Sequence, residues 1–141
     1  AYRVLQRAWR AGEAMLGELK ATLPPNHAPA ELPLVVAPRL VELCFQTAGV
    51  LEIGATGRMG LPRQVRRLRI LRAGAEAGER TLVALVQPRE DGSFDALVAD
   101  QAGDVYLRLE GYRTVALPTA LPADALRPFA AAVRPAVEVP A

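Results

Sequence analysis

The stretch "RLVELCFQTAG" (residues 39–49) decides the fold, because nearly every position in it is apolar or small. Apolar residues continue on both sides, and the pattern predicts one helix over residues 38–53 that is apolar around almost its whole circumference. Pro38 suits the first position of a helix. The glycines of "GATGRMG" (residues 54–60) end it. A helix of this composition has to be covered by other elements on most of its sides.

Two polar residues interrupt this helix, and they are four positions apart. Glu42 and Gln46 therefore lie on the same helical face, one turn from each other. One interpretation is an ion pair of Glu42 with Arg39 at a helix end that reaches solvent. The other is a carboxyl in an apolar pocket, where such groups can hold a proton near neutral pH and donate it. Gln46 would then donate its amide to one carboxyl oxygen and leave the other oxygen for a substrate.

The rest of the chain predicts an antiparallel sheet. Residues 2–10 and 14–23 form a hairpin around a turn at 11–13, and residues 24–33, with four prolines, form a loop. Further strands are expected at residues 61–71, 79–87, 93–99 and 105–115. Short turns rich in Gly and Asp separate them, which makes neighbouring strands antiparallel. One sheet wrapped around one central helix is the hot-dog arrangement, an α+β fold.

Composition limits the class of protein. The 141 residues suit one domain, and a net charge of +2 is too small to indicate nucleic acid as a partner. Cys44 is the only cysteine, so no internal disulfide forms, and we expect a reducing, cytoplasmic setting. No apolar run spans a membrane without a charge, so no membrane association is expected. Because the chain begins at Ala1 inside a predicted strand, we expect a fragment of a longer polypeptide.

Few residues other than Glu42 offer chemistry. His27 is the only histidine, so any histidine base in this chain has to be this one; it lies in the proline-rich loop. One Cys and one His give no metal site. The glycines of residues 54–60 follow a helix and do not match the dinucleotide-binding pattern.

A basic strand follows the helix, with arginines at positions 63, 66, 67, 69 and 72. Strand alternation predicts that Leu68 and Ile70 point inward while Arg67 and Arg69 point to solvent. This strand is either a solvated outer face or a docking surface for an acidic partner.

The helix carries a family likeness. The segment "ELCFQTAGVL" (residues 42–51) resembles E-A-M-x-Q-x-x-G-x-L of the hot-dog β-hydroxyacyl-acyl-carrier-protein dehydratases of bacterial fatty acid synthesis. Residues 1–118 resemble the second, C-terminal hot-dog of the dehydratase domain in polyketide synthases. The matching stretches are "AYRVLQRAWRAGEAMLGEL" (1–19), "APRLVELCFQ" (37–46), "LPRQVRRLRILRAG" (61–74) and "LVADQAGDVYLRLEGYRTVALP" (97–118). Residues 119–141 are then an Ala/Pro-rich tail or linker, with one short helix expected at 123–133.

The resemblance implies a dehydratase that eliminates water from a 3-hydroxyacyl thioester. The family's acid, which protonates the departing hydroxyl, maps to Glu42, and the glutamine that hydrogen-bonds it maps to Gln46. The family's histidine base lies in an H-x-x-x-G-x-x-x-x-P motif of the first hot-dog. That motif is absent here, so the fragment is expected to be inactive alone and completed by an N-terminal hot-dog of the same polypeptide.

The resemblance also implies a partner, and no cofactor is expected for the domain itself. The acyl chain arrives on the phosphopantetheine arm of an acyl carrier protein, and such carriers are typically acidic. The candidate docking residues for this partner are Arg58, Arg63, Arg66 and Arg67.

Two other functions are compatible with the residues. The polyketide enzymes usually carry Asp at the position of Glu42, and this departure, with the missing base, fits a non-catalytic acyl-binding or scaffold hot-dog. Alternatively, the chain is a self-contained dimeric hot-dog dehydratase that uses His27 across the dimer. An exposed sheet edge also allows the fragment to associate with itself.

Overall fold

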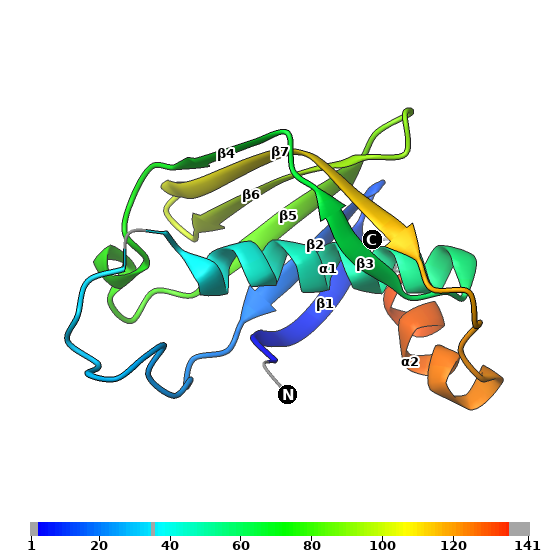
Figure 1. Ribbon diagram of the computed structural model, residues 1–141, viewed down its shortest axis with the longest axis horizontal. Coiled ribbons are helices and arrows are strands. Elements are labelled where there is room, and N and C mark those ends of the chain that lie inside the picture. Colours follow the sequence, from blue (N-terminus) through cyan, green and yellow to red (C-terminus); the bar gives the residue numbers. More distant parts are fainter. Residues whose placement is uncertain (1–2, 35, 136–141) are drawn as a thin grey trace, which may run out of the picture.

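One long helix packed against a single antiparallel sheet forms the centre of the molecule (Figure 1). The computed structural model describes residues 3–34 and 36–135. The helix is α1 (Pro38–Thr56), and a second, shorter helix is α2 (Ala123–Ala132). The other elements are β1 (Leu5–Ala11), β2 (Ala14–Leu19), β3 (Gly60–Gln64), β4 (Arg67–Ile70), the 3-10 helix η1 (Gly74–Ala77), β5 (Leu82–Pro88), β6 (Phe94–Asp100) and β7 (Val105–Ala116). The predicted α+β architecture is confirmed.

The sheet order is β1-β2-β5-β6-β7-β3, and β4 also pairs with β7. Every pair is antiparallel. The long strand β7 pairs with β6 along one side, and with β4 and then β3 along the other. This arrangement leaves β1, β3 and β4 at the edges of the sheet, among the described residues.

The prediction of one continuous strand over residues 61–71 was wrong, because two strands occupy this segment. They pair with different halves of β7, and the break between them lies at Val65 and Arg66. Opposite the break, Gly111 of β7 has a φ of 65°, a conformation that favours glycine. A Cβ at this position would lie 2.8 Å from the Cβ of Arg66. The close passage of the two backbones therefore requires a glycine where β7 changes partner.

The other strand bounds differ from the predictions at their ends. β2 stops at Leu19, and β5 begins only at Leu82. Before β5, η1 occupies part of a predicted turn. Leu68 and Ile70 were predicted to point inward, but 38% and 39% of their surfaces are exposed. Tyr2, where the first strand was predicted to begin, lies outside the described residues, as do residues 136–141 of the tail.

One side of α1 is buried in the core. Its Leu43, Cys44 and Ala48 are almost fully buried and pack with Val86 and Val98 of the sheet. The contact with β2 is close because β2 presents Gly17 to the helix, and a Cβ there would overlap the Oγ1 of Thr47. The core thus fixes which face of α1 turns away from the sheet.

The C-terminal part of α1 is covered by α2, as Figure 1 shows. The helix was predicted to end before Gly54, but it runs on to Thr56. Gly57 caps it with a φ of 72°. Gly54 is needed inside the helix because a Cβ there would clash with Val133 and approach the carbonyl oxygen of Phe129. The predicted helix over 123–133 is confirmed, whereas the domain boundary at residue 118 stays a prediction.

No helix in the described part of the chain is long and apolar enough to cross a membrane.

Candidate functional site

A groove of about 930 Å³ runs along the face of α1 that carries Glu42 and Gln46. Side chains of α1, β1, β3, β7 and α2 line it. On α1 these are Glu42, Phe45, Gln46, Gly49, Val50 and Ile53, and on α2 they are Pro128, Phe129 and Ala132. Most of the lining is apolar, and α1 contributes only one carboxyl and one amide. This composition is typical of a ligand site, in which a few polar groups orient a mostly apolar ligand.

Glu42 and Gln46 meet in this groove. The Nε2 of Gln46 donates a hydrogen bond to the Oε1 of Glu42 at 2.8 Å. The predicted contact between the amide and one carboxyl oxygen is therefore confirmed. The other oxygen, Oε2, forms no hydrogen bond or ion pair with any residue that the structure describes, and Glu42 as a whole is half-buried.

The amide of Gln46 is held in one orientation by strand β1. Its Oε1 accepts hydrogen bonds from the backbone N–H groups of Val4 and Leu5, at 3.2 and 3.1 Å. The β1–β2 register shifts next to this point, between Leu5 and Arg7. Because two N–H donors require the carbonyl oxygen of the amide, its NH₂ group has to face Glu42. The orientation of the carboxyl is thus fixed by the backbone of another element.

The alternative ion pair of Glu42 with Arg39 is not formed among the described residues. The Nε and Nη2 atoms of Arg39 have no hydrogen-bond partner there and are shielded from solvent. Glu42 therefore pairs with Gln46, one turn later in the helix, and not with Arg39.

An aromatic pair forms part of the groove wall. Phe45 of α1 stacks on Tyr112 of β7, with ring centroids 4.4 Å apart. Burial, followed by the charges of Glu52 and Glu42, raises the pKa of Tyr112 well above its ordinary value. The phenol is therefore protonated at neutral pH. The sequence analysis missed Tyr112, because its contact with α1 joins residues 67 positions apart and leaves no local pattern.

Neither His27 nor Cys44 lies in the groove. His27 is in the loop between β2 and α1, and its ring nitrogens are shielded and have no hydrogen-bond partner among the described residues. Cys44 is on the core side of α1, where burial raises the pKa of its thiol to about 12. Cys44 is thus a packing residue, and the groove as described has no histidine.

The four candidate docking arginines have different surroundings. Arg58 donates from Nη1 to the carbonyl oxygens of Pro118 and Leu117, at 2.6 and 3.4 Å. Arg67 faces solvent as predicted and lies 3.7 Å from Glu110. Arg63 is exposed, and Arg66 lines a separate polar cleft.

That polar cleft has a volume of about 740 Å³ and lies near the turn between β5 and β6. Its charges are largely paired with each other: Arg113 lies 2.7 Å from Asp91, and Arg89 lies 3.5 Å from Asp95. Hydrogen bonds from the side chain and the backbone of Ser93 lower the pKa of Asp91. Because these charges are paired with each other, we interpret the cleft as a structural feature of the β5–β6 turn.

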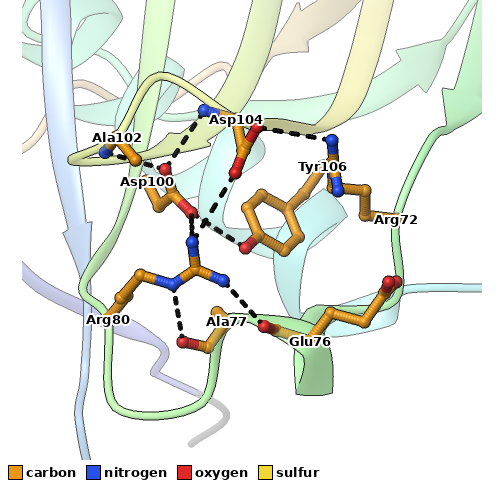
Figure 2. Close-up of polar contacts among 8 residues, drawn as sticks. All are labelled: Arg72, Glu76, Ala77, Arg80, Asp100, Ala102, Asp104 and Tyr106. Carbon is orange, nitrogen blue, oxygen red and sulfur yellow. Dashed lines mark hydrogen bonds and ion pairs between the residues drawn. The ribbon is translucent and has the colours of Figure 1, made fainter.

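A second held carboxyl is that of the buried Asp100, which lies in a polar cluster whose residues do not line the groove (Figure 2). The Oδ2 of Asp100 accepts a hydrogen bond from the hydroxyl of Tyr106 and pairs with Nη1 of Arg80, both at 2.9 Å. Its Oδ1 accepts from the backbone N–H groups of Ala102 and Asp104. The cluster fixes the β6–β7 turn and, through Arg80, the segment after η1. Sequence reasoning missed it, because Arg80 is distant in sequence from the other members.

The fold and this site define a class of protein: a hot-dog domain with a held carboxyl facing an apolar groove. The family model described as "Polyketide synthase dehydratase N-terminal domain" matches residues 1–124. The chain therefore belongs to the polyketide synthase dehydratase family. No curated protein matches the chain.

Solved structures share the fold of this chain. A dehydratase from work on substrate selection for the borrelidin and fluvirucin polyketide synthases is 20% identical, with a TM-score of 0.63 over 86% of this chain. A fusion DH domain is 25% identical, with a TM-score of 0.55 over 94%. An inactive mutant of the CurK dehydratase is 18% identical, with a TM-score of 0.60 over 82%. This chain covers 40%, 44% and 41% of those three chains, respectively.

Proposed function

We propose that this domain is the second hot-dog of a polyketide-synthase-type dehydratase and supplies the acid of its active site. The reaction removes water from a 3-hydroxyacyl thioester carried on the phosphopantetheine arm of an acyl carrier protein. The observation that carries the proposal is the Gln46 bridge. It connects the start of β1 to one oxygen of Glu42, a residue that lines the groove, and leaves the other oxygen without a partner among the described residues.

In this mechanism, Glu42 acts as a general acid. A base removes the proton on C2 of the acyl group, the electron pair forms the C2=C3 double bond, and the C3–O bond breaks. Protonated Glu42 transfers its proton to the departing hydroxyl, which leaves as water. The amide of Gln46 keeps Oε1 occupied, so that Oε2 is the atom that carries and transfers the proton.

The base has to come from outside the groove as described. The only histidine of the chain, His27, is not among the groove's lining residues, and the family's H-x-x-x-G-x-x-x-x-P motif does not occur. This division supports the placement as a second hot-dog, completed by an N-terminal hot-dog with the histidine. The chain spans less than half of each of the three solved chains compared above, which is compatible with one hot-dog out of two.

The sheet offers a surface for that N-terminal hot-dog. The segment of β3 and β4 is an edge of the sheet and exposes large apolar side chains, each between 36% and 50% accessible. They are Leu61, Val65, Leu68, Ile70 and Leu71. Apolar side chains gathered at a sheet edge are typical of a surface that another element covers. The exposure of Leu68 and Ile70 thus supports an interface between the two hot-dogs on their face of β4, which is opposite to the face of Arg67.

The test is the dehydration rate of the polypeptide that joins this hot-dog to its N-terminal partner, assayed with a 3-hydroxyacyl pantetheine thioester. Glu42→Gln is expected to lower the rate by roughly 10²–10⁴-fold, because it removes the transferable proton. Glu52→Gln is the matched control. Glu52 lies on the same helix but accepts hydrogen bonds from the hydroxyl of Thr114, which an amide oxygen can also accept. An unchanged rate in Glu42→Gln contradicts the proposal.

The same assay separates the two alternatives. A double hot-dog that binds the thioester without dehydrating it supports the scaffold function. If the 141-residue chain dehydrates the substrate alone and His27→Ala abolishes the reaction, the domain is a self-contained dimeric enzyme.

A further inference from the structure

Helix α2 forms a wall of the groove although most of it lies beyond the family match. The match ends at residue 124, and α2 spans Ala123–Ala132. Pro128, Phe129 and Ala132 nevertheless line the groove together with α1. The residues of this wall therefore lie outside the part of the chain that matches the family model.

This wall is held firmly against α1. Gly54 of α1 admits the backbone of Phe129 and the side chain of Val133, and Leu126 lies near Gly57. Strand β1 adds a further contact, because Nη1 of Arg10 donates to the carbonyl oxygen of Val133 at 3.1 Å. A helix fixed at both α1 and β1 can limit the size of a ligand, as a detached tail cannot.

The groove changes character along α1. On the β1 side of the groove, the polar lining residues are Arg3, just before the strand, and Gln6 and Arg7 within it. Eleven residues further along from Glu42, at about 16 Å by the helical rise, α1 contributes Ile53, and α2 packs beside it at Gly54 and adds its own lining residues. A thioester with its reacting carbons at Glu42 thus finds an apolar path along α1 toward α2.

We propose that α2 is the closed end of the acyl pocket and that Phe129 sets the longest acyl group that the domain accommodates. This inference rests on the proposed function, because Glu42 defines where the reacting carbons lie. The half-buried ring of Phe129 meets the far end of the acyl chain. Each further methylene buried before that point contributes about 0.8 kcal/mol, or about fourfold in affinity, and methylenes beyond it contribute nothing.

The experiment measures binding and not turnover. Saturated S-acyl pantetheines with acyl groups of increasing length, which cannot be dehydrated, are titrated calorimetrically into the 141-residue chain. Affinity is expected to rise about fourfold per methylene and then to level off at a definite length. In Phe129→Ala the plateau moves to longer acyl groups, and in Phe129→Trp it moves to shorter ones. Leu126→Ala is the matched control, since Leu126 lies on α2 but not in the groove, and it keeps the wild-type plateau.

Two results overturn the inference. One is a plateau at the same acyl length in wild type, Phe129→Ala and Phe129→Trp; the other is a wild-type affinity that does not depend on length. Phe129→Trp keeps a large aromatic side chain, so it tests the inference even if Phe129→Ala loosens α2. Failure of the dehydration assay leaves these binding results unchanged, so the pocket and the reaction are judged separately.

Discussion

Glu42 and Asp100 are both carboxyls held by neighbouring groups, but they differ in what remains after their hydrogen bonds are made. Both oxygens of Asp100 are used within the protein, by Tyr106, Arg80 and two backbone N–H groups (Figure 2). Glu42 has one oxygen bound to Gln46, and its other oxygen has no partner among the described residues.

The difference separates a structural carboxyl from a reactive one. A buried charge whose acceptor sites are all filled stabilises the fold and has no capacity for a substrate. A carboxyl with one oxygen fixed and one free is oriented and still able to exchange a proton, as an active site requires. Changes at the Glu42 site should therefore lower the dehydration rate, whereas changes at Asp100 should lower stability alone.

The largest effect that sharpens this comparison is expected for Gln46→Leu. This change removes the donor to Glu42 and also the acceptor for the N–H groups of Val4 and Leu5. A lost hydrogen bond to a charged group corresponds to roughly 10- to 100-fold in the dehydration rate. The unpaired backbone groups should lower the free energy of unfolding by about 1–3 kcal/mol. Rate assays of the double hot-dog and urea unfolding of the chain measure the two effects.

Gln46→Glu is the matched variant, because its carboxylate still accepts from β1 but, when ionised, cannot donate to Glu42. Compared with Gln46→Leu, this variant should recover more of the wild-type free energy of unfolding than of the wild-type dehydration rate. If both recover together, Gln46 acts only through the backbone of β1.

Asp100→Asn should affect stability alone. Burial by itself raises the pKa of this carboxyl, but hydrogen bonds from Tyr106, Asp104 and Ala102 and the charge of Arg80 outweigh it and lower the pKa below 3.8. The ionised form therefore stabilises the fold above that pH, and this stabilisation is lost as the pH falls through the lowered value. At neutral pH the variant should melt roughly 5 °C or more below wild type.

The pH dependence checks the assignment. The difference in stability between wild type and Asp100→Asn should begin to shrink as the pH falls below 3.8, where Asp100 of the unfolded chain takes up a proton, and should be lost below the lowered pKa of the folded state. Asp104→Asn, at a half-exposed carboxyl of the same cluster, should cost less. A large fall in the dehydration rate of fully folded Asp100→Asn would contradict the structural role.

The sequence predicted local relations well and long-range ones poorly. The central helix and the Glu42–Gln46 contact depend on spacing within one element, and both were predicted. The break between β3 and β4 depends on Gly111 of a later strand, and the Asp100 cluster depends on Arg80. Neither contact leaves a periodic signal in its own segment.

The same distinction applies to the groove. Its α1 side followed from the helical pattern, but its α2 wall requires Gly54 to contact a segment about eighty residues later. The exposure of Leu68 and Ile70 is a third case. Alternation shows that two side chains share a strand face, but it does not show whether that face is covered by the same chain.

The smallest expected effect concerns the proposed docking of the acyl carrier protein. Arg58 binds two backbone carbonyls, and Arg67 shares Glu110 with Arg69. Much of this positive charge is therefore offset or fixed locally. What remains for an acidic carrier is a weak attraction that steers the encounter and adds little to affinity.

Replacing Arg63, Arg66 and Arg67 together with Ser should lower kcat/KM for a carrier-bound substrate by roughly tenfold at low salt. The loss should be smaller at physiological ionic strength, where charges are screened over about 8 Å. The free pantetheine thioester is the control substrate, and its kcat/KM should not change, because none of these arginines lines the groove of Glu42. Equal losses on both substrates indicate damage to the fold, and no loss on either removes the docking surface from the proposal.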